Sequence, residues 1–235
     1  MPKKIPHSAI VLSIAEDNVA RALGVARPLQ GLADIIEIRL DTLAEPALEP
    51  FVQGLTTPLL FTNRPAWEGG QWQGAEEARL DLLCQAANAG AALVDLELRA
   101  PDQSWQRLLA ESGPSCAVVA SWHDFSSTPT APELEAILLE MKGRGADLAK
   151  IVTTAHDYRD VLRVLGLQMV AAQENMPLAA FAMGEAGRIS RAATLELGGA
   201  LTYAAADQAS ATAPGQLTVA QIRQIQGILQ GGDDD

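Results

Sequence analysis

Cysteine, lysine and net positive charge are all scarce in this chain of 235 residues. Its two cysteines, Cys84 and Cys116, stand in apolar surroundings, suggest no disulfide framework and favour a reducing, cytoplasmic compartment. The formal net charge is −12 and no basic stripe is visible, which argues against nucleic acid as a partner. No apolar run approaches the roughly 18–20 residues that cross a bilayer, so no membrane partner is expected.

Eight short apolar stretches recur along the chain at fairly even spacing. They span residues 9–15, 34–41, 58–64, 92–98, 116–123, 147–153, 177–183 and 200–206. Segments with helical periodicity follow several of them, at 74–90, 131–145, 156–175 and 218–230. Strand followed by helix, repeated about eight times, is the signature of a (β/α)8 TIM barrel, an α/β fold. A doubly wound open sheet is the competing architecture, but no glycine-rich nucleotide fingerprint follows the first strand.

No linker or low-complexity segment interrupts this repeat. The chain is therefore expected to form a single domain over residues 1–235, with short polar tails at about 1–7 and 230–235. The basic residues before the first apolar stretch lead into a first strand rather than a signal peptide, because that stretch is short and lacks a convincing cleavage site.

Two of the expected strands place charged side chains on one face. In "IIEIRLD", Glu37, Arg39 and Asp41 alternate with isoleucine and leucine, and in "LVDLEL", Asp95 and Glu97 alternate with leucine. In a barrel the outward face is apolar because it lies under helices, so these charges are expected to point inward. Inward charges are costly unless they pair or act, which leaves both a structural ion-pair network and a functional site open.

Lys150 is one of only four lysines and lies within the apolar stretch "DLAKIVT". As a structural residue it would form a salt bridge with an inward carboxylate such as Asp95 or Glu97. As a functional residue it would be desolvated and close to cations, and its pKa would fall from the reference value of about 10.4. A neutral amine attacks a ketone or aldehyde to give a Schiff base, so Lys150 is a candidate nucleophile.

His123 ends the fifth expected strand, on the face where barrel enzymes build their sites. It is either a proton-transfer residue or a satisfied core histidine, whereas His7 and His156 are expected at the surface. Arg64 is followed by "PAWEGGQWQG", whose glycines and tryptophans are typical of a mobile lid with a stacking surface. Glu68 in this segment either faces water or orients His123.

Three arginines, Arg39, Arg64 and Arg191, stand at or after the ends of expected strands in an acidic protein. Such a group favours an anionic ligand, and the planar fork of arginine suits a carboxylate. The segment "SATAPGQ" (210–216) follows the last strand and offers hydroxyl and amide contacts. The residues alone therefore predict a barrel enzyme with an imine-forming lysine, a histidine for proton transfer and an arginine-lined anion pocket.

Several motifs occur in one order from the second strand to the last loop. They are "EIRLD", "FTNRPAWEGG", "DLEL", "SWHDFSSTP", "GADLAKI", "AMGEAGRISR" and "APGQ". "DLEL" alone is weak, but the set is highly specific and resembles the type I 3-dehydroquinate dehydratase family, the Schiff-base dehydroquinases of the shikimate pathway, which leads to the aromatic amino acids. The chain departs from the family at Thr212, where a serine is usual, and at Phe181, where a methionine is usual.

The resemblance implies that 3-dehydroquinate loses water to give 3-dehydroshikimate, with neither a metal nor an organic cofactor. It implies that Lys150 forms an imine with the C3 ketone, that His123 moves the C2 proton to the leaving C1 hydroxyl, and that Glu68 orients His123. Arg191 and Gln216 would hold the substrate carboxylate, and a homodimer is implied. The full set of implied substrate contacts is Ser13, Glu37, Arg39, Arg64, Met183, Arg191, Thr212 and Gln216.

Three rival interpretations stay open. A class I aldolase-like barrel would share the lysine but make or break a carbon–carbon bond. A metal enzyme would use Glu37, Asp95, Glu97 and His123 as ligands, although the nearby cations would repel the metal ion. A non-catalytic barrel would bind a carboxylate metabolite without turning it over.

Overall fold

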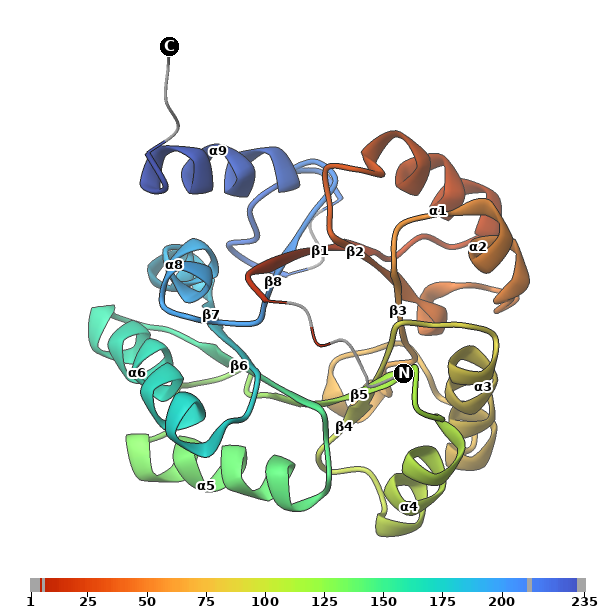
Figure 1. The fold of residues 1–235 in the computed structure, drawn as a ribbon, viewed down its shortest axis with the longest axis horizontal. Coiled ribbons are helices and arrows are strands. Elements are labelled where there is room, and N and C mark those ends of the chain that lie inside the picture. Colours follow the sequence, from red (N-terminus) through yellow and green to blue (C-terminus); the bar gives the residue numbers. More distant parts are fainter. Residues whose placement is uncertain (1–4, 6, 211–212, 232–235) are drawn as a thin grey trace.

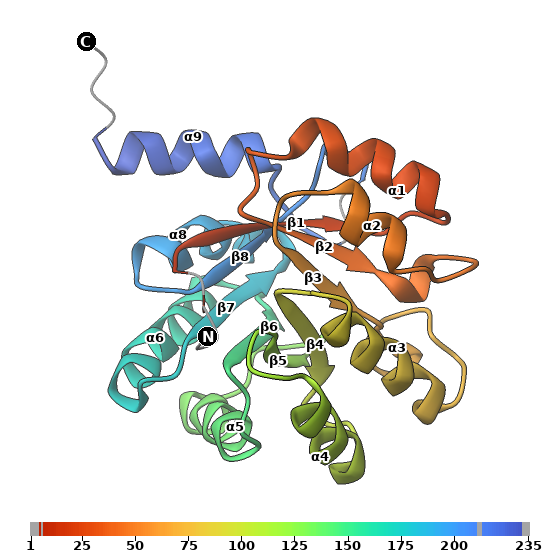
Figure 2. The same ribbon diagram turned by 45° about the vertical axis from the view of Figure 1, so that its right-hand side comes forward.

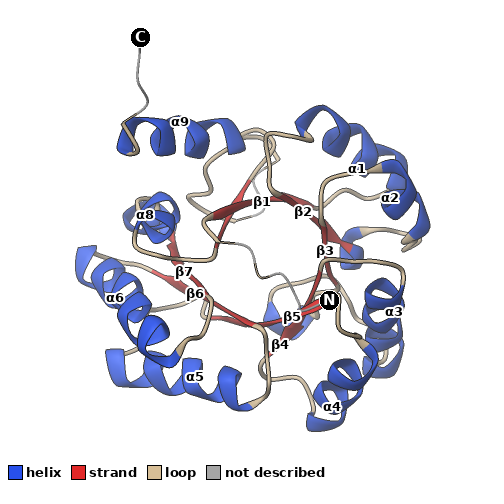
Figure 3. Ribbon diagram, in the orientation of Figure 1, coloured by secondary structure: helices blue, strands red, loops and turns tan. Residues whose placement is uncertain are grey.

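Eight parallel strands surrounded by helices build the barrel seen in the computed structural model of this chain (Figure 1, Figure 3). The structure describes residues 5, 7–210 and 213–231. The strands are β1 (Ala9–Ile14), β2 (Ile35–Arg39), β3 (Leu59–Thr62), β4 (Leu93–Glu97), β5 (Ala117–His123), β6 (Leu148–Thr154), β7 (Leu178–Met183) and β8 (Leu201–Ala204). Each expected apolar stretch coincides with one of them to within a residue or two, so the barrel prediction is confirmed and the open-sheet alternative is wrong.

The strands pair in the order β7-β6-β5-β4-β3-β2-β1-β8, which nearly closes the sheet. In the described part of the chain no strand ladder joins β7 to β8. A backbone hydrogen bond from the amide of Ala200 to the carbonyl of Leu178 (2.7 Å) crosses that gap where the two strands begin. The sheet is therefore a barrel with one weakly joined edge.

Helices alternate with the strands and cover the outside of the sheet (Figure 2). The α-helices are α1 (Val19–Ala26), α2 (Glu49–Gly54), α3 (Glu76–Asn88), α4 (Asp102–Glu111), α5 (Ala131–Gly143), α6 (Tyr158–Glu174), α7 (Gly184–Gly187), α8 (Ser190–Glu196) and α9 (Val219–Leu229). Short 3-10 turns are η1 (Arg27–Leu29), η2 (Leu40–Thr42) and η3 (Ala66–Glu68). None of the described helices combines the length and the apolar character needed to span a bilayer.

Local side chains explain where the long helices begin and end. Thr130 and Glu133 form a capping box at the start of α5, since each satisfies a backbone amide of the other. Asp157 caps α6 by accepting hydrogen bonds from the first free amides of that helix, and Asn175 ends it in the left-handed conformation. All four helical segments expected from periodicity are confirmed.

The two faces of the strands bury different residues. Outward residues such as Ile36 and Ile38 belong to one large apolar core that lies between the sheet and the helices. Inward residues such as Ile35, Leu60 and Leu148 fill the barrel floor as a second core. Because side chains alternate along a strand, the charges of β2 and β4 lie on the inward face, as predicted.

Candidate active site

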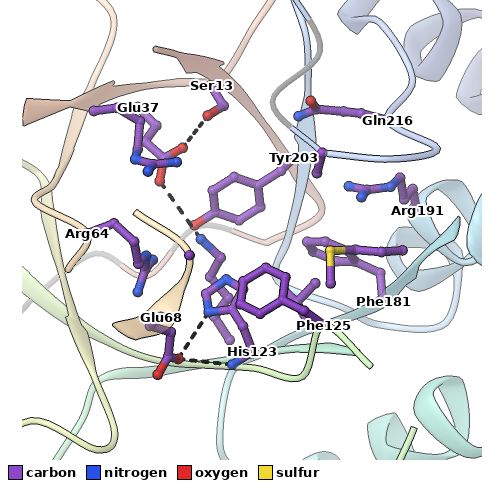
Figure 4. Close-up of a pocket in the computed structure, with 16 residues that line it drawn as sticks. Ser13, Glu37, Arg64, Glu68, His123, Phe125, Phe181, Arg191, Tyr203 and Gln216 are labelled. Atoms are coloured by element: carbon purple, nitrogen blue, oxygen red, sulfur yellow. Dashed lines mark hydrogen bonds and ion pairs between the residues drawn. The ribbon is translucent and has the colours of Figure 1, made fainter. Parts of the chain in front are cut away.

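A pocket opens inside the barrel at the carboxyl ends of the strands (Figure 4). Of the residues assigned to the site from sequence, those that line it are Ser13, Glu37, Arg39, Arg64, Glu68, His123, Lys150, Met183, Arg191 and Gln216. Thr212 lies outside the described residues. The structure therefore brings together, in one cavity, residues that are far apart in the sequence, and it leaves His7 and His156 exposed at the surface as expected.

Lys150 points into the pocket from the middle of β6 and is only 5% exposed. Its amine lies 3.4 Å from Asp95 Oδ2 and 3.8 Å from Glu37 Oε1. Burial lowers its pKa below the ordinary value; the two carboxylates oppose this effect, and Arg64 and Arg39 add to it. The expected structural partner Asp95 is thus present, Glu97 is not a partner, and the amine faces the cavity shared with His123.

Glu37 is held by hydroxyl groups on the two strands that flank β2. Thr62 on β3 donates to Glu37 Oε1 (2.7 Å), and Ser13 on β1 donates to Glu37 Oε2. In the register of the sheet, Ser13 stands directly beside Glu37. These two bonds fix the carboxylate at the edge of the pocket, and Lys150 is its ion-pair partner at 3.8 Å.

Arg64 is the centre of a buried ion-pair network. Its Nη2 donates to Asp95 (2.9 Å), and its Nη1 donates to Glu97 (2.6 Å) and to the hydroxyl of Ser121 (2.6 Å). On the far side of Glu97, Arg79 of α3 donates from its own Nη1 (2.6 Å). Burial alone would lower the pKa of Arg64, but Asp95 and Glu97 raise it above its ordinary value. Arg79 was not expected from the sequence.

Asp41 departs from the predicted strand face, because β2 ends at Arg39 and Asp41 lies in the 3-10 turn η2. There its two oxygens receive both Nε (2.8 Å) and Nη2 (2.7 Å) of Arg39. Asp41 also accepts backbone hydrogen bonds from Arg64 (3.1 Å) and Gln71 (2.9 Å). It therefore anchors the segment that carries Glu68 to the rim of the barrel, a role that strand alternation does not predict.

Glycines allow this segment to pack tightly over the pocket. A Cβ atom on Gly70 would lie 2.0 Å from the carbonyl oxygen of Arg64, which no side chain could tolerate. Gly69 has a φ of 77° and lies against the ring of Phe125, 2.5 Å from where its Cβ would be. The mobility of this lid stays a prediction.

His123 and Glu68 form a pair at the wall of the pocket. Glu68 Oε1 lies 3.2 Å from His123 Nδ1 and accepts a hydrogen bond from the backbone amide of His123 (3.0 Å). The expectation that Glu68 orients His123 fits this contact, and the alternative that it faces water does not. The imidazole stacks on Phe125, with 5.8 Å between ring centroids.

The protonation of this pair is set by burial. Burial and the neighbouring cations, Arg64 first among them, hold the pKa of His123 well below its ordinary value, so the imidazole is neutral. Burial raises the pKa of Glu68 to about 7. The second oxygen of Glu68 has no hydrogen bond among the described residues, although Arg99 lies 3.7 Å away.

Arg191 is the one pocket arginine for which the described residues provide no carboxylate partner. It is 1% exposed; its Nη2 donates to the carbonyl of Pro214 (3.4 Å), and its Nε has no partner there. Its guanidinium lies 4.9 Å above the ring of Phe181. Burial lowers its pKa to about 10, which a bound anion would reverse.

Two aromatic residues complete the pocket and were missed in the sequence. Phe125 follows His123, and Tyr203 reaches in from β8, where its ring centroid lies 3.8 Å from Lys150 Nζ. Phe125 could have been found, because it lies two residues after His123 within the motif "SWHDFSSTP". Tyr203 stands in the plain apolar stretch "ALTYAAA", which carries no such signal.

The metal alternative does not fit these contacts. Glu37, Asp95 and Glu97 would have to turn toward one ion together with His123. Instead, each carboxylate is hydrogen bonded to a hydroxyl or guanidinium group, as described above. Fold and site together define a barrel in which a buried amine, a neutral imidazole and a guanidinium without a described carboxylate partner face one cavity.

Comparisons with known proteins identify the family. The model of the type I 3-dehydroquinase family matches residues 10–233. The 3-dehydroquinate dehydratase of Desulfotalea psychrophila is 46% identical over 219 residues, which cover 92% of this chain and 96% of the relative. The enzyme of the same name from Methanocaldococcus jannaschii is 33% identical over 92% of this chain and 96% of its own length.

Solved structures agree with the sequence comparison. The 3-dehydroquinate dehydratase from Geobacillus kaustophilus superposes with a TM-score of 0.83 at 31% identity, covering 97% of this chain and 92% of that one. The type I enzyme from Clostridium difficile, solved with covalently modified comenic acid, gives 0.86 at 27% identity, covering 98% and 94%. This chain belongs to the type I 3-dehydroquinase family. It is a dehydratase of the shikimate pathway, a carbon–oxygen lyase of the type that works through a Schiff base.

Proposed function

We propose that this pocket dehydrates 3-dehydroquinate to 3-dehydroshikimate, with Lys150, His123 and Glu68 as its catalytic residues and with no metal or organic cofactor. One observation carries this assignment. A buried amine with a lowered pKa shares a cavity with a buried guanidinium that the described residues leave without a carboxylate. An anionic ketone satisfies both groups at once.

The reaction begins at Lys150. Its neutral amine adds to the C3 carbonyl, the carbinolamine loses water, and a protonated imine remains. This cation withdraws electrons from the C2–H bond, and the proton moves to His123. The electron pair then forms the C1–C2 double bond as the C1 hydroxyl leaves with a proton from His123. Water hydrolyses the imine and frees both the product and Lys150.

His123 is suited to accept the C2 proton because its imidazole is neutral. If Nδ1–H donates to Glu68, the other ring nitrogen keeps its lone pair for the substrate. Glu68 thereby fixes both the tautomer and the ring orientation. It acts through His123, in the manner of a triad carboxylate, and its own raised pKa keeps a proton close to the pair near neutral pH.

The remaining pocket residues bind the substrate in this proposal. Arg191 and Gln216 hold the carboxylate, and Thr212, outside the described residues, is assigned to the same group. Glu37, Arg39 and Arg64 face the ring hydroxyls, Met183 gives apolar contact, and Ser13 supports Glu37.

Borohydride reduction in the presence of 3-dehydroquinate tests the mechanism. We expect a stable ligand mass on Lys150, located by peptide mass spectrometry. Lys150→Ala is the matched control: it should fold, bind the substrate, form no adduct and show no turnover. Absence of an adduct in the folded wild-type chain, or normal turnover in the variant, would eliminate the imine assignment. Activity should also survive EDTA, and full loss would instead favour a metal.

A homodimer in the cytoplasm is part of the same proposal. Leu162, Leu165 and Met169 form a stripe along one face of α6, and Leu162 and Met169 are strongly exposed, which suits contact with a second copy. Cys84 and Cys116 are both buried and form no disulfide, which suits a reducing compartment. Light scattering should give a dimer mass for the wild type and a monomer mass for Leu162→Glu with Met169→Glu; equal masses would rule out this face.

A further inference from the structure

The hydroxyl of Tyr203 is a buried polar group that has no role in the proposed mechanism. Tyr203 is 4% exposed and lines the pocket, and its hydroxyl has no hydrogen-bond partner among the described residues. A buried hydroxyl without a partner costs free energy, so its presence calls for a ligand that satisfies it. A phenylalanine would fill the same space at no such cost.

The position of the ring places this hydroxyl beside the reacting amine. Lys150 Nζ lies 3.8 Å from the centroid of the ring, against its face. In Figure 4 the hydroxyl end points away from Gln216 and Arg191, toward the side of the pocket that carries Glu37 and Arg64. The hydroxyl is therefore directed away from the groups assigned to the substrate carboxylate, on a ring that also contacts the reacting amine.

The chemical state of the phenol makes it a donor. Burial, together with the negative charges of Glu37 and Asp95, raises the pKa of Tyr203 well above its ordinary value, so the group stays neutral. It does not act as a base and can donate one hydrogen bond. Glu37, whose charge acts on this phenol, already accepts hydrogen bonds from Ser13 and Thr62.

We infer that the Tyr203 hydroxyl donates a hydrogen bond to the oxygen on C3 of the substrate, both as carbonyl and as the carbinolamine hydroxyl. The inference rests on the imine mechanism proposed above. As Lys150 adds, the C3–O double bond opens and its oxygen gains electron density, which a fixed donor stabilises. That oxygen then leaves as water with a proton from His123, and the same position receives the water that hydrolyses the product imine. Tyr203 keeps its own proton throughout.

Tyr203→Phe tests this role because it removes one oxygen and keeps the ring against Lys150. In rapid-quench experiments with borohydride, we expect the Lys150 adduct to form about tenfold more slowly, the effect of one lost hydrogen bond. Tyr158→Phe is the matched control, since the chain has two tyrosines and Tyr158 is 67% exposed at the start of α6. It should match the wild type in every measurement.

An isotope effect separates this role from others in the pocket. The isotope effect is the ratio of kcat with unlabelled substrate to kcat with substrate deuterated at C2. In Tyr203→Phe this ratio should fall toward one, because imine formation and hydrolysis then limit the rate. A slower variant that keeps its isotope effect, an adduct that forms at the wild-type rate, or a rise in KM alone would each overturn the inference. If the wild type itself gives no adduct, the proposed function fails instead.

Stability provides an independent readout. Because the hydroxyl has no described partner, Tyr203→Phe should melt at the wild-type temperature or above. A clearly lower melting temperature would mean that the hydroxyl holds the empty fold together, and it would overturn its assignment to the substrate.

Discussion

Arg64 and Arg191 stand in the same pocket, both buried, and differ in almost every contact. Arg64 donates to Asp95, Glu97 and Ser121 at 2.6–2.9 Å, while Arg191 donates to one carbonyl at 3.4 Å. The pKa of Arg64 is raised by its carboxylates, and burial lowers that of Arg191 to about 10. The first guanidinium has its counter-charges within the protein. The second has no carboxylate partner among the described residues, and the proposed partner is the substrate carboxylate.

This contrast distinguishes an arginine whose charge is balanced inside the barrel from one whose proposed partner is the substrate carboxylate. Removing one member of a buried ion pair leaves an uncompensated charge, whereas removing a buried charge that lacks a carboxylate relieves a cost. The same substitution should therefore have opposite effects on stability at the two positions.

Arg64→Met should have the largest effect on folding. It removes one of the two cations beside each carboxylate, since Asp95 keeps only Lys150 and Glu97 keeps only Arg79. The free energy of unfolding in urea should therefore fall by about 3 kcal/mol. Arg21→Met, which breaks an exposed pair with Asp17, serves as the control and should cost less than about 1 kcal/mol. Equal losses in the two variants would show that the buried network contributes no more than a surface pair.

Arg191→Met should leave the fold as stable as the wild type or more so, and should act on binding instead. Loss of a charge-assisted contact of about 3 kcal/mol corresponds to a rise of about 100-fold in KM for 3-dehydroquinate. Steady-state kinetics and thermal unfolding measure the two effects. A destabilised variant with an unchanged KM would show that Arg191 acts in folding and not in substrate binding.

Glu68→Gln should reveal a pH dependence of stability. Burial raises the pKa of Glu68 from 4.5 to about 7, so the folded chain binds more protons than the unfolded chain between these values. The stabilising contribution of the protonated carboxyl is complete below about pH 4.5 and is lost as the pH rises through 7. The wild type should therefore lose about 2–3 kcal/mol relative to the variant between pH 4.5 and 8. A constant difference across this range would contradict the raised pKa.

Phe181→Leu should have the smallest effect. The ring of Phe181 lies 4.9 Å from the guanidinium of Arg191, and this cation–π contact is worth about 1 kcal/mol. Without it, KM should rise about fivefold. Because Phe181 is buried in the inner core, the smaller leucine should also lower the free energy of unfolding by about 1 kcal/mol. A change as large as that of Arg191→Met would mean that Phe181, rather than the guanidinium, dominates recognition.

The sequence predicted the strands well because their pattern is local. The alternation that places Glu37 and Asp95 on the inward face follows from the period of a strand, and the structure confirms it. The site residues came from motifs, and those among them that the structure describes line one pocket. Residue identity and spacing were sufficient for this part of the site.

Contacts across the barrel were not predictable in the same way. Arg79 reaches Glu97 from α3, and Tyr203 reaches Lys150 from β8, so both depend on how distant elements meet. Nothing near either residue in the sequence marks it. Asp41 was assigned to a strand face, but the chain turns after Arg39 and uses it to hold the lid segment.

The weakly joined edge between β7 and β8 has a consequence for the enzyme at work. Arg191 follows β7, Gln216 follows β8, and Lys150 lies on β6. A molecule that contacts all three residues would therefore bridge the edge between β7 and β8. In the proposed binding mode, bound substrate would stabilise this edge in proportion to its occupancy, and the proposed imine would make the link to Lys150 covalent.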